Sequence, residues 1–271
     1  MLGSSIQKCG AAKAPSWVQV TALGQDGDPC TMAIPVQLPH KLLEFLIEDC
    51  KLTIPTDLVR NYWDHLDSVQ DQYAATTKRF RDANSRLIWP VGLHGDEASL
   101  GLQQDQTQVY GFFLNIPLFR PTATRMSRWL LWSLESTRVL SAEDTIYPLL
   151  REIVASLNRA TTAGVSGRRF LVTELRGDQA WFRLIFNHAS HWVSHNVCYR
   201  CRATAKPTSD NYAIYDCPAP ARSTEDFIKE ELPATGELCY LAATRPSLPR
   251  QTVLKCRAPS RSRSGKPAAR C

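Results

Sequence analysis

Hydrophobic residues change their spacing along the chain, and these changes predict a succession of helices and strands. Residues 1–38 carry only short apolar patches, which are typical of loop or weak strand. Apolar residues then recur at helical spacing in 42–47, from 57 to about 78 and in 144–157, and each segment predicts a helix. The third has Pro148 near its start, where a proline is tolerated because a first-turn N–H has no partner inside the helix.

Short apolar runs between and after these helices predict strands at 86–94, 109–116 and 170–175. Pro90 cannot donate a ladder hydrogen bond, so the first strand is expected to lie at a sheet edge, to contain a bulge or to start at Val91. Residues 129–140 fit a strand and a helix equally well.

In this order the elements predict an α/β fold in which helices flank a mixed sheet. We expect a mostly helical N-terminal region in 1–80, a core in 86–240 and a disordered basic tail in 241–271, which is rich in Ser, Pro and Arg. Within the core, a final helix is expected over 179–188, with Asp178 as its N-cap.

Composition predicts a globular protein without a membrane span. The chain has 271 residues, of which 44% are hydrophobic, and this share is sufficient for a buried core. No run approaches the roughly 18 apolar residues of a membrane span, and the N-terminus has no signal-peptide pattern. We therefore expect a nuclear or cytoplasmic protein that is not secreted, with most of its nine cysteines as reduced thiols.

The basic residues are concentrated near the C-terminal end of the sequence. Of the 32 Lys and Arg, eight lie after residue 240 with no acid among them, so the remaining 24 nearly balance the 26 acids. Such a tail attracts DNA or another polyanion through counterion release. A solvated end or a localisation signal explains the same charges.

Two aspartates follow predicted strands: Asp96 comes after 91–94, and Asp178 comes after 170–175. Strand ends can bring distant carboxylates to one point, where they share Mg²⁺ ions about 3.5–4 Å apart beside a phosphodiester. The interval between the two acids has room for two strands and a helix, which is the order of a ribonuclease-H-like nuclease core. The alternative is structural, because Asp96 suits a turn and Asp178 suits a helix N-cap.

A cluster of zinc-ligand residue types follows the last predicted helix: His188, His191, His195, Cys198 and Cys201. Structural zinc takes four such ligands, and Cys198 and Cys201 have the spacing of one half-site. In one alternative the second half comes from His191 and His195, which lie one helical turn apart. In the other it comes from Cys217 and Cys239, while His188 suits the end of its own helix.

The sequence lacks the motifs of two other classes of enzyme. There is no G-x-S-x-G segment to present a nucleophilic serine. There is also no G-x-x-x-x-G-K-[ST] loop to cradle phosphates. Serine-hydrolase chemistry and P-loop nucleotide chemistry are therefore not expected.

Four segments occur in a characteristic order: W-P-V-G-L-H-G-D-E-A, N-I-P-L-F-R, V-T-E-L-R-G-D-Q-A-W-F and V-C-Y-R-C. Y-W-D-H-L from Tyr62 precedes them, and A-P-A-R-S-T-E-D-F-I at 219–228 follows them. Together they resemble the transposase-like proteins of dinoflagellate genomes, which are similar to the CACTA and Plavaka (KDZ-type) cut-and-paste transposases. The resemblance covers about residues 60–230, with Ala221 where the family has a tryptophan.

The resemblance implies that Asp96 and Asp178 are metal-binding carboxylates and that Cys198 and Cys201 form a structural knuckle. The family carries a third acid beyond the cysteine pair, and this sequence has no match for it. The predicted function is therefore that of a truncated or degenerate transposase-derived protein that binds DNA and has a partial two-metal site for phosphodiester transfer, with catalysis lost. The alternative is a non-enzymatic, zinc-stabilised module that binds nucleic acid or protein.

Overall fold

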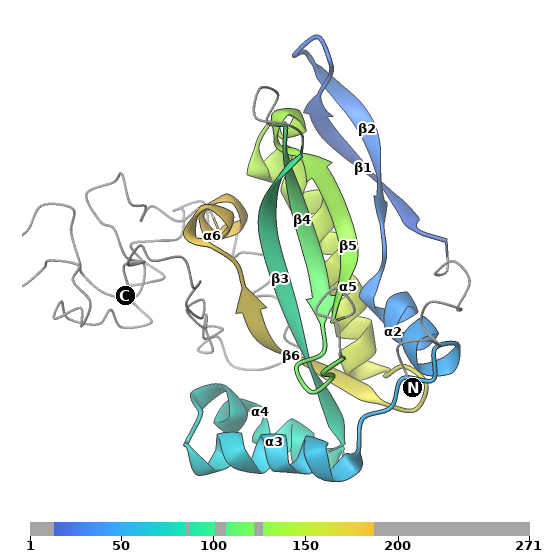
Figure 1. Ribbon diagram of the computed structural model, residues 1–271, viewed down its shortest axis with the longest axis vertical. Helices are drawn as coiled ribbons and strands as arrows, with labels where there is room; N and C mark the ends of the chain where they lie inside the picture. The colour runs from blue at the N-terminus through green and yellow to red at the C-terminus, as the bar shows by residue number, and fades with distance from the viewer. Residues whose placement is uncertain (1–13, 85–86, 101–106, 122–126, 187–271) are drawn as a thin grey trace, which may run out of the picture. The chain divides into compact units, whose positions relative to one another are not determined.

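The computed structural model describes residues 14–84, 87–100, 107–121 and 127–186 (Figure 1). They belong to two compact units, one ending at Leu175 and the other beginning at Arg176. In chain order the elements are β1 (Ser16–Leu23), β2 (Pro29–Val36), α2 (Pro39–Glu48), α3 (Thr56–Ser68), α4 (Gln72–Ala83), β3 (Ile88–Leu100), β4 (Thr107–Asn115), β5 (Arg128–Glu135), the 3-10 turn η2 (Ser136–Arg138), the π-turn η3 (Ala142–Ile146), α5 (Tyr147–Thr162), β6 (Arg169–Arg176) and α6 (Gln179–Phe186). Within these residues no helix is long and apolar enough to cross a membrane.

A four-stranded sheet in the order β5-β4-β3-β6 forms the centre of the first unit. The pairs β3–β4 and β4–β5 are antiparallel, whereas β6 runs beside β3 in the same direction (Figure 1). The connection from β5 to β6 passes through α5, which lies behind the sheet in Figure 1. The fold therefore confirms the predicted α/β class with a mixed sheet and flanking helices.

One face of the sheet and one stripe of α5 make up much of the core. Leu93 of β3 pairs with Leu114 of β4, and both are almost completely buried, as is Phe112. On α5 the apolar residues predicted to form one stripe are buried, including Leu150 and Ile153. Burial of these side chains contributes roughly 1.5–3 kcal/mol each, so packing between the helix and the sheet stabilises the unit.

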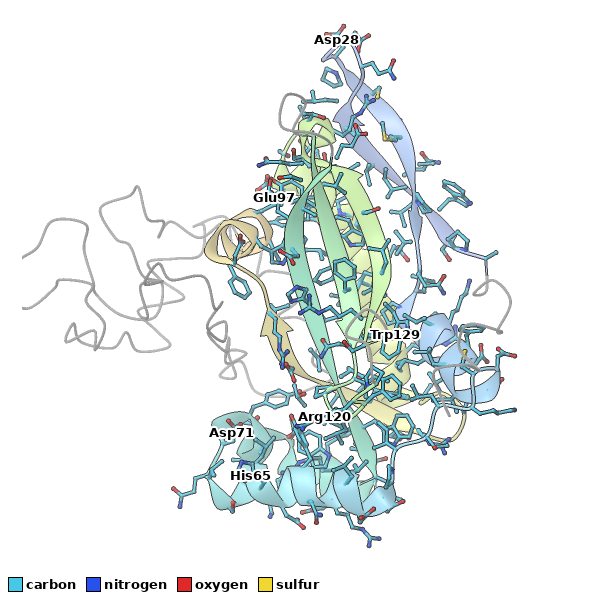
Figure 2. The ribbon with its side chains drawn as sticks, in the orientation of Figure 1. Asp28, His65, Asp71, Glu97, Arg120 and Trp129 are labelled. Carbon is cyan, nitrogen blue, oxygen red and sulfur yellow. The ribbon has the colours of Figure 1, made fainter. Side chains whose placement is uncertain are left out.

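The segment 16–36, for which the sequence indicates loop or weak strand, is an antiparallel β-hairpin of β1 and β2. Its turn is closed by a hydrogen bond from Gly24 N to Asp28 O (2.7 Å), and Gly27 adopts a φ of 85°, which glycine tolerates without strain. Figure 2 shows Asp28 at the tip of the hairpin. Directly after β2, the N–H of Gln37 donates to the carbonyl of Leu131 in β5 (2.7 Å), which joins the hairpin to the sheet.

The single helix predicted from 57 to about 78 is wrong, because two helices, α3 and α4, occupy this region. The break comes at Gln70, whose φ of 52° lies in the left-handed region. Asp71 then accepts hydrogen bonds from the N–H groups of Tyr73 and Ala74 through Oδ1, at 2.9 and 3.1 Å. An aspartate that caps the second helix so well competes with continuation of the first.

The strand predicted at 86–94 is longer than expected and runs from Ile88 to Leu100. Its ladder with β4 begins at Gly92, so Pro90 precedes that ladder and interrupts none of its hydrogen bonds. The other predicted strands are confirmed as β4 and β6. The ambiguous segment 129–140 divides into strand β5 and turn η2.

Candidate functional site

Asp96 lies inside β3, opposite Gly111 of β4, and not at the end of a strand as predicted. The prediction is wrong because pairing with β4 continues beyond H-G-D-E as far as Leu100, which makes this segment strand and not turn. Alternation along β3 places Gly92, His94 and Asp96 on the face opposite the buried Leu93. Their side of the sheet is therefore the one that presents polar chemistry.

Two glycines on this face make room for the side chains of their neighbours. Asn115 lies over Gly92, where an added Cβ would be 2.4 Å from its Oδ1. The Phe113 ring lies over Gly111, where an added Cβ would be 2.7 Å from the ring. The His94 ring then packs beside Phe113, with centroids 6.1 Å apart. The imidazole is thus held in place by packing, and its side chain is only 14% exposed.

The carboxylate of Asp96 is accessible, with 55% of the side chain exposed. Its Oδ1 accepts the N–H of Glu97 at 3.0 Å, and its Oδ2 lies 3.4 Å from Nε2 of His94. Figure 2 labels Glu97 on β3, next to Asp96 in the chain. A carboxylate in this setting retains oxygen lone pairs for a cation or a hydrogen-bond donor.

Arg128, the first residue of β5, approaches the same group of side chains from two strands away. It pairs across the ladder with Asn115, and its Nη1 lies 3.1 Å from Nε2 of His94. Nε2 of His94 therefore lies within hydrogen-bond distance of a guanidinium nitrogen and of a carboxylate oxygen, and the tautomer of the ring sets which of the two contacts it makes as donor or acceptor.

Asp178 caps α6, as the sequence predicts. Its Oδ1 accepts the N–H of Trp181 at 2.7 Å, and its carbonyl accepts the N–H of Phe182 at 3.1 Å. Trp181 and Phe182 are both buried, so the first turn of α6 combines a polar cap with an apolar anchor. The residue itself is exposed.

The predicted zinc ligands His191, His195, Cys198 and Cys201 lie outside the described residues, together with His188, the other two candidate cysteines and the basic tail 241–271. Within the part of the chain that the structure does describe, no group of three or more His, Cys, Asp or Glu side chains is arranged to hold a metal ion. The zinc site therefore stays a prediction.

His94 and Arg128 are site residues that sequence reasoning missed. His94 carried a usable signal, because it lies two residues before Asp96 and a strand places such residues on one face. Arg128 carried none, because its approach depends on the pairing of β4 with β5. β6 also contains an acid, Glu174, which is buried together with its apolar neighbours in the strand.

A serine and a histidine also meet, but at a place without catalytic access. The hydroxyl of Ser156 in α5 accepts the backbone N–H of His40 at 2.9 Å and lies 2.8 Å from its Nδ1. Ser156 is only 3% exposed, so no substrate reaches its oxygen. The pair instead satisfies a backbone donor in the first turn of α2 and ties that helix to α5.

We expect Ser156→Ala to lower the free energy of unfolding by about 1–2 kcal/mol, because it removes the acceptor of the partly buried N–H of His40. Urea denaturation followed by circular dichroism measures the change. Thr162→Ala is the matched control on the same helix, since its exposed hydroxyl donates to the carbonyl of Asn158 within that helix. Equal midpoints for the two variants would contradict the structural role of Ser156.

Comparison of the chain with family models, with curated proteins and with solved structures found no match in any of the three. The function of the site is therefore argued from its geometry and chemistry.

Proposed function

We propose that residues 86–240 are a ribonuclease-H-like core of a transposase-derived, DNA-binding protein. In this proposal Asp96 and Asp178 form a partial two-metal site, and strand cleavage is not part of the proposed function, because the sequence shows no match for the family's third acid. The observation that carries the proposal is the strand order. β3, β4 and β5 form an antiparallel meander, and β6 returns through α5 to the free side of β3. This is the arrangement expected of a ribonuclease-H-like core.

The register of β6 against β3 supports the proposal that Asp96 and Asp178 bind the same cations. Thr173 of β6 donates through Oγ1 to the carbonyl of Val91 in β3 at 3.4 Å, so these residues lie at about the same level. Neighbouring strands that run in one direction rise by the same length per residue. Along the sequence, Asp96 lies five residues after Val91, and Asp178 lies five residues after Thr173.

The chemistry of the two groups suits a divalent cation. Mg²⁺ prefers carboxylate oxygens and keeps several waters, so few protein ligands are needed. Capping of α6 uses Oδ1 of Asp178, and a carboxylate has a second oxygen that can bind a cation at the same time. Two carboxylates without a third hold cations more weakly than a complete site does, which is why the proposal includes binding but not strand cleavage.

We expect Asp96→Asn and Asp178→Asn each to weaken divalent-cation binding about a hundredfold, because loss of a direct ligand costs at least as much as loss of a supporting one. Mn²⁺ takes the same oxygen ligands as Mg²⁺, and its electron paramagnetic resonance signal measures the bound fraction on the full chain. Asp28→Asn removes the same charge at the hairpin tip and serves as the control (Figure 2).

Unchanged manganese binding in either site variant would reject the shared site. The alternative function, a zinc-stabilised interaction module, is tested by measuring the zinc content of the purified chain and of its variants. If zinc is present in the purified chain and is lost in Cys198→Ser, while Asp178→Asn leaves all metal binding unchanged, the alternative replaces the proposal. Purified protein without zinc removes the alternative.

A further inference from the structure

We propose that Arg128 binds a backbone phosphate of the nucleic acid directly beside the carboxylate of Asp96. The class of ligand rests on the proposed function, but the role of Arg128 rests on its own contacts. It would make Arg128 a substrate-positioning residue that neither the sequence pattern nor the order of the strands assigns.

Arg128 is on the same face of the sheet as the candidate metal ligand. It pairs with Asn115, and Asn115 pairs in turn with Gly92, which shares one face of β3 with His94 and Asp96. Cross-strand partners place their side chains on a common face. Nη1 of Arg128 lies 3.1 Å from Nε2 of His94, so the guanidinium turns toward the side chain that also contacts Asp96.

The charge of this guanidinium is available to an anion. Arg128 is exposed, and within the described residues it forms no ion pair with a carboxylate. Its contact on this face is with an imidazole nitrogen and not with a carboxylate oxygen. A guanidinium has five N–H donors in a planar fork, so several remain for the oxygens of a phosphate, which it binds in bidentate fashion.

His94 also keeps the two opposite charges apart. Its Nε2 lies 3.1 Å from Nη1 of Arg128 and 3.4 Å from Oδ2 of Asp96, so the ring occupies the place where a direct ion pair would form. The cation and the anion are therefore separated by no more than those two lengths together. One phosphate group would span such a gap, with one oxygen on the guanidinium and another turned toward the cation that Asp96 would hold in the proposed function.

The test is fluorescence anisotropy of the full chain with a fluorescein-labelled DNA duplex, measured over a series of potassium chloride concentrations. We expect Arg128→Ala to bind about tenfold more weakly, which is the loss of one charge-assisted contact. The loss should be similar for duplexes of different sequence, and the slope of log K against log salt should fall by about 0.9, as for one phosphate contact. Arg60→Ala, at an exposed arginine of α3, is the charge-matched control.

Arg128→Lys keeps the charge but not the fork, so it should keep the salt slope of the parent and lose part of the affinity. Equal affinity and equal salt slope in Arg128→Ala and Arg60→Ala would overturn the proposal. Manganese binding separates this result from the proposed function. Arg128→Ala should retain it, and if the parent binds no manganese at all, the metal site fails while the DNA comparison still decides the role of Arg128.

Discussion

Asp67→Ala is expected to destabilise the first unit by about 3–5 kcal/mol, because it leaves a buried positive charge without its partner. The side chain of Arg81 in α4 is completely buried, and its Nη2 lies 2.6 Å from Oδ1 of Asp67 in α3. Nη2 also donates to the carbonyl of Ala74 at 2.9 Å, and the guanidinium lies 4.6 Å from the ring centroid of Trp63. Only the carboxylate of Asp67 offsets this charge by direct ion pairing within the described residues.

The double variant Asp67→Ala with Arg81→Met is the control for this effect. It removes the charge together with its partner and fills the space with an apolar chain of similar volume, so it should be markedly more stable than the single variant. Urea unfolding monitored by tryptophan fluorescence and by circular dichroism gives both values. If Asp67→Ala costs less than about 1 kcal/mol, the pair is no more than a surface salt bridge.

Phe170→Ala is expected to cost about 3–5 kcal/mol, because it removes a large, fully buried side chain from the junction of β6 with the rest of the core. Phe170 is 1% exposed, and its ring meets that of Trp89 edge-on at a centroid distance of 5.9 Å. Its carbonyl accepts the hydroxyl of Thr161 in α5 at 2.8 Å, so the residue connects the strand to β3 and to the helix.

Thermal or urea unfolding measures this loss, with two variants for comparison. Phe170→Leu keeps most of the buried area and should cost much less than the alanine variant. Trp17→Ala truncates an aromatic residue that is 65% exposed, and it should change stability by no more than about 0.5 kcal/mol. Similar losses in Phe170→Ala and Trp17→Ala would show that β6 is not anchored as described.

The elements that the sequence predicts correctly are those whose pattern is set by burial. The helix α5 carries an apolar stripe at helical spacing, and β4 and β6 are short apolar runs between breaks. In the segment that joins α5 to β6, Gly164 and Gly167 adopt positive φ values, which favour glycine. In these elements the local pattern of apolar residues and the burial in the folded protein agree, so the pattern predicts the element correctly.

The errors arise where a neighbouring strand or a cap decides the outcome. β3 extends to Leu100 because β4 pairs with it that far, and the residues H-G-D-E give no indication in the sequence of a partner strand. The break between α3 and α4 depends on the capping by Asp71 and on the backbone of Gln70, within a segment whose apolar spacing alone continues the helix.

In the candidate site, too, one part could be predicted from the sequence and the other part could not. Capping by Asp178 is readable from sequence, since an aspartate before an apolar helix is a local signal. The environment of Asp96 is not, because Arg128 reaches it from a strand that begins 32 residues later in the chain. Residues of different strands that share a face are known only once the register is known.

The hydrogen bond between Gln37 and Leu131 has a consequence for how the molecule meets copies of itself. In the described part of the chain β5 is an outer strand of the four-stranded sheet, and such strands invite pairing with strands of other molecules. The segment leaving β2 uses one of the outward-facing carbonyl groups of β5. At Leu131, therefore, the carbonyl is already bonded within the chain and is not open to a strand of another molecule.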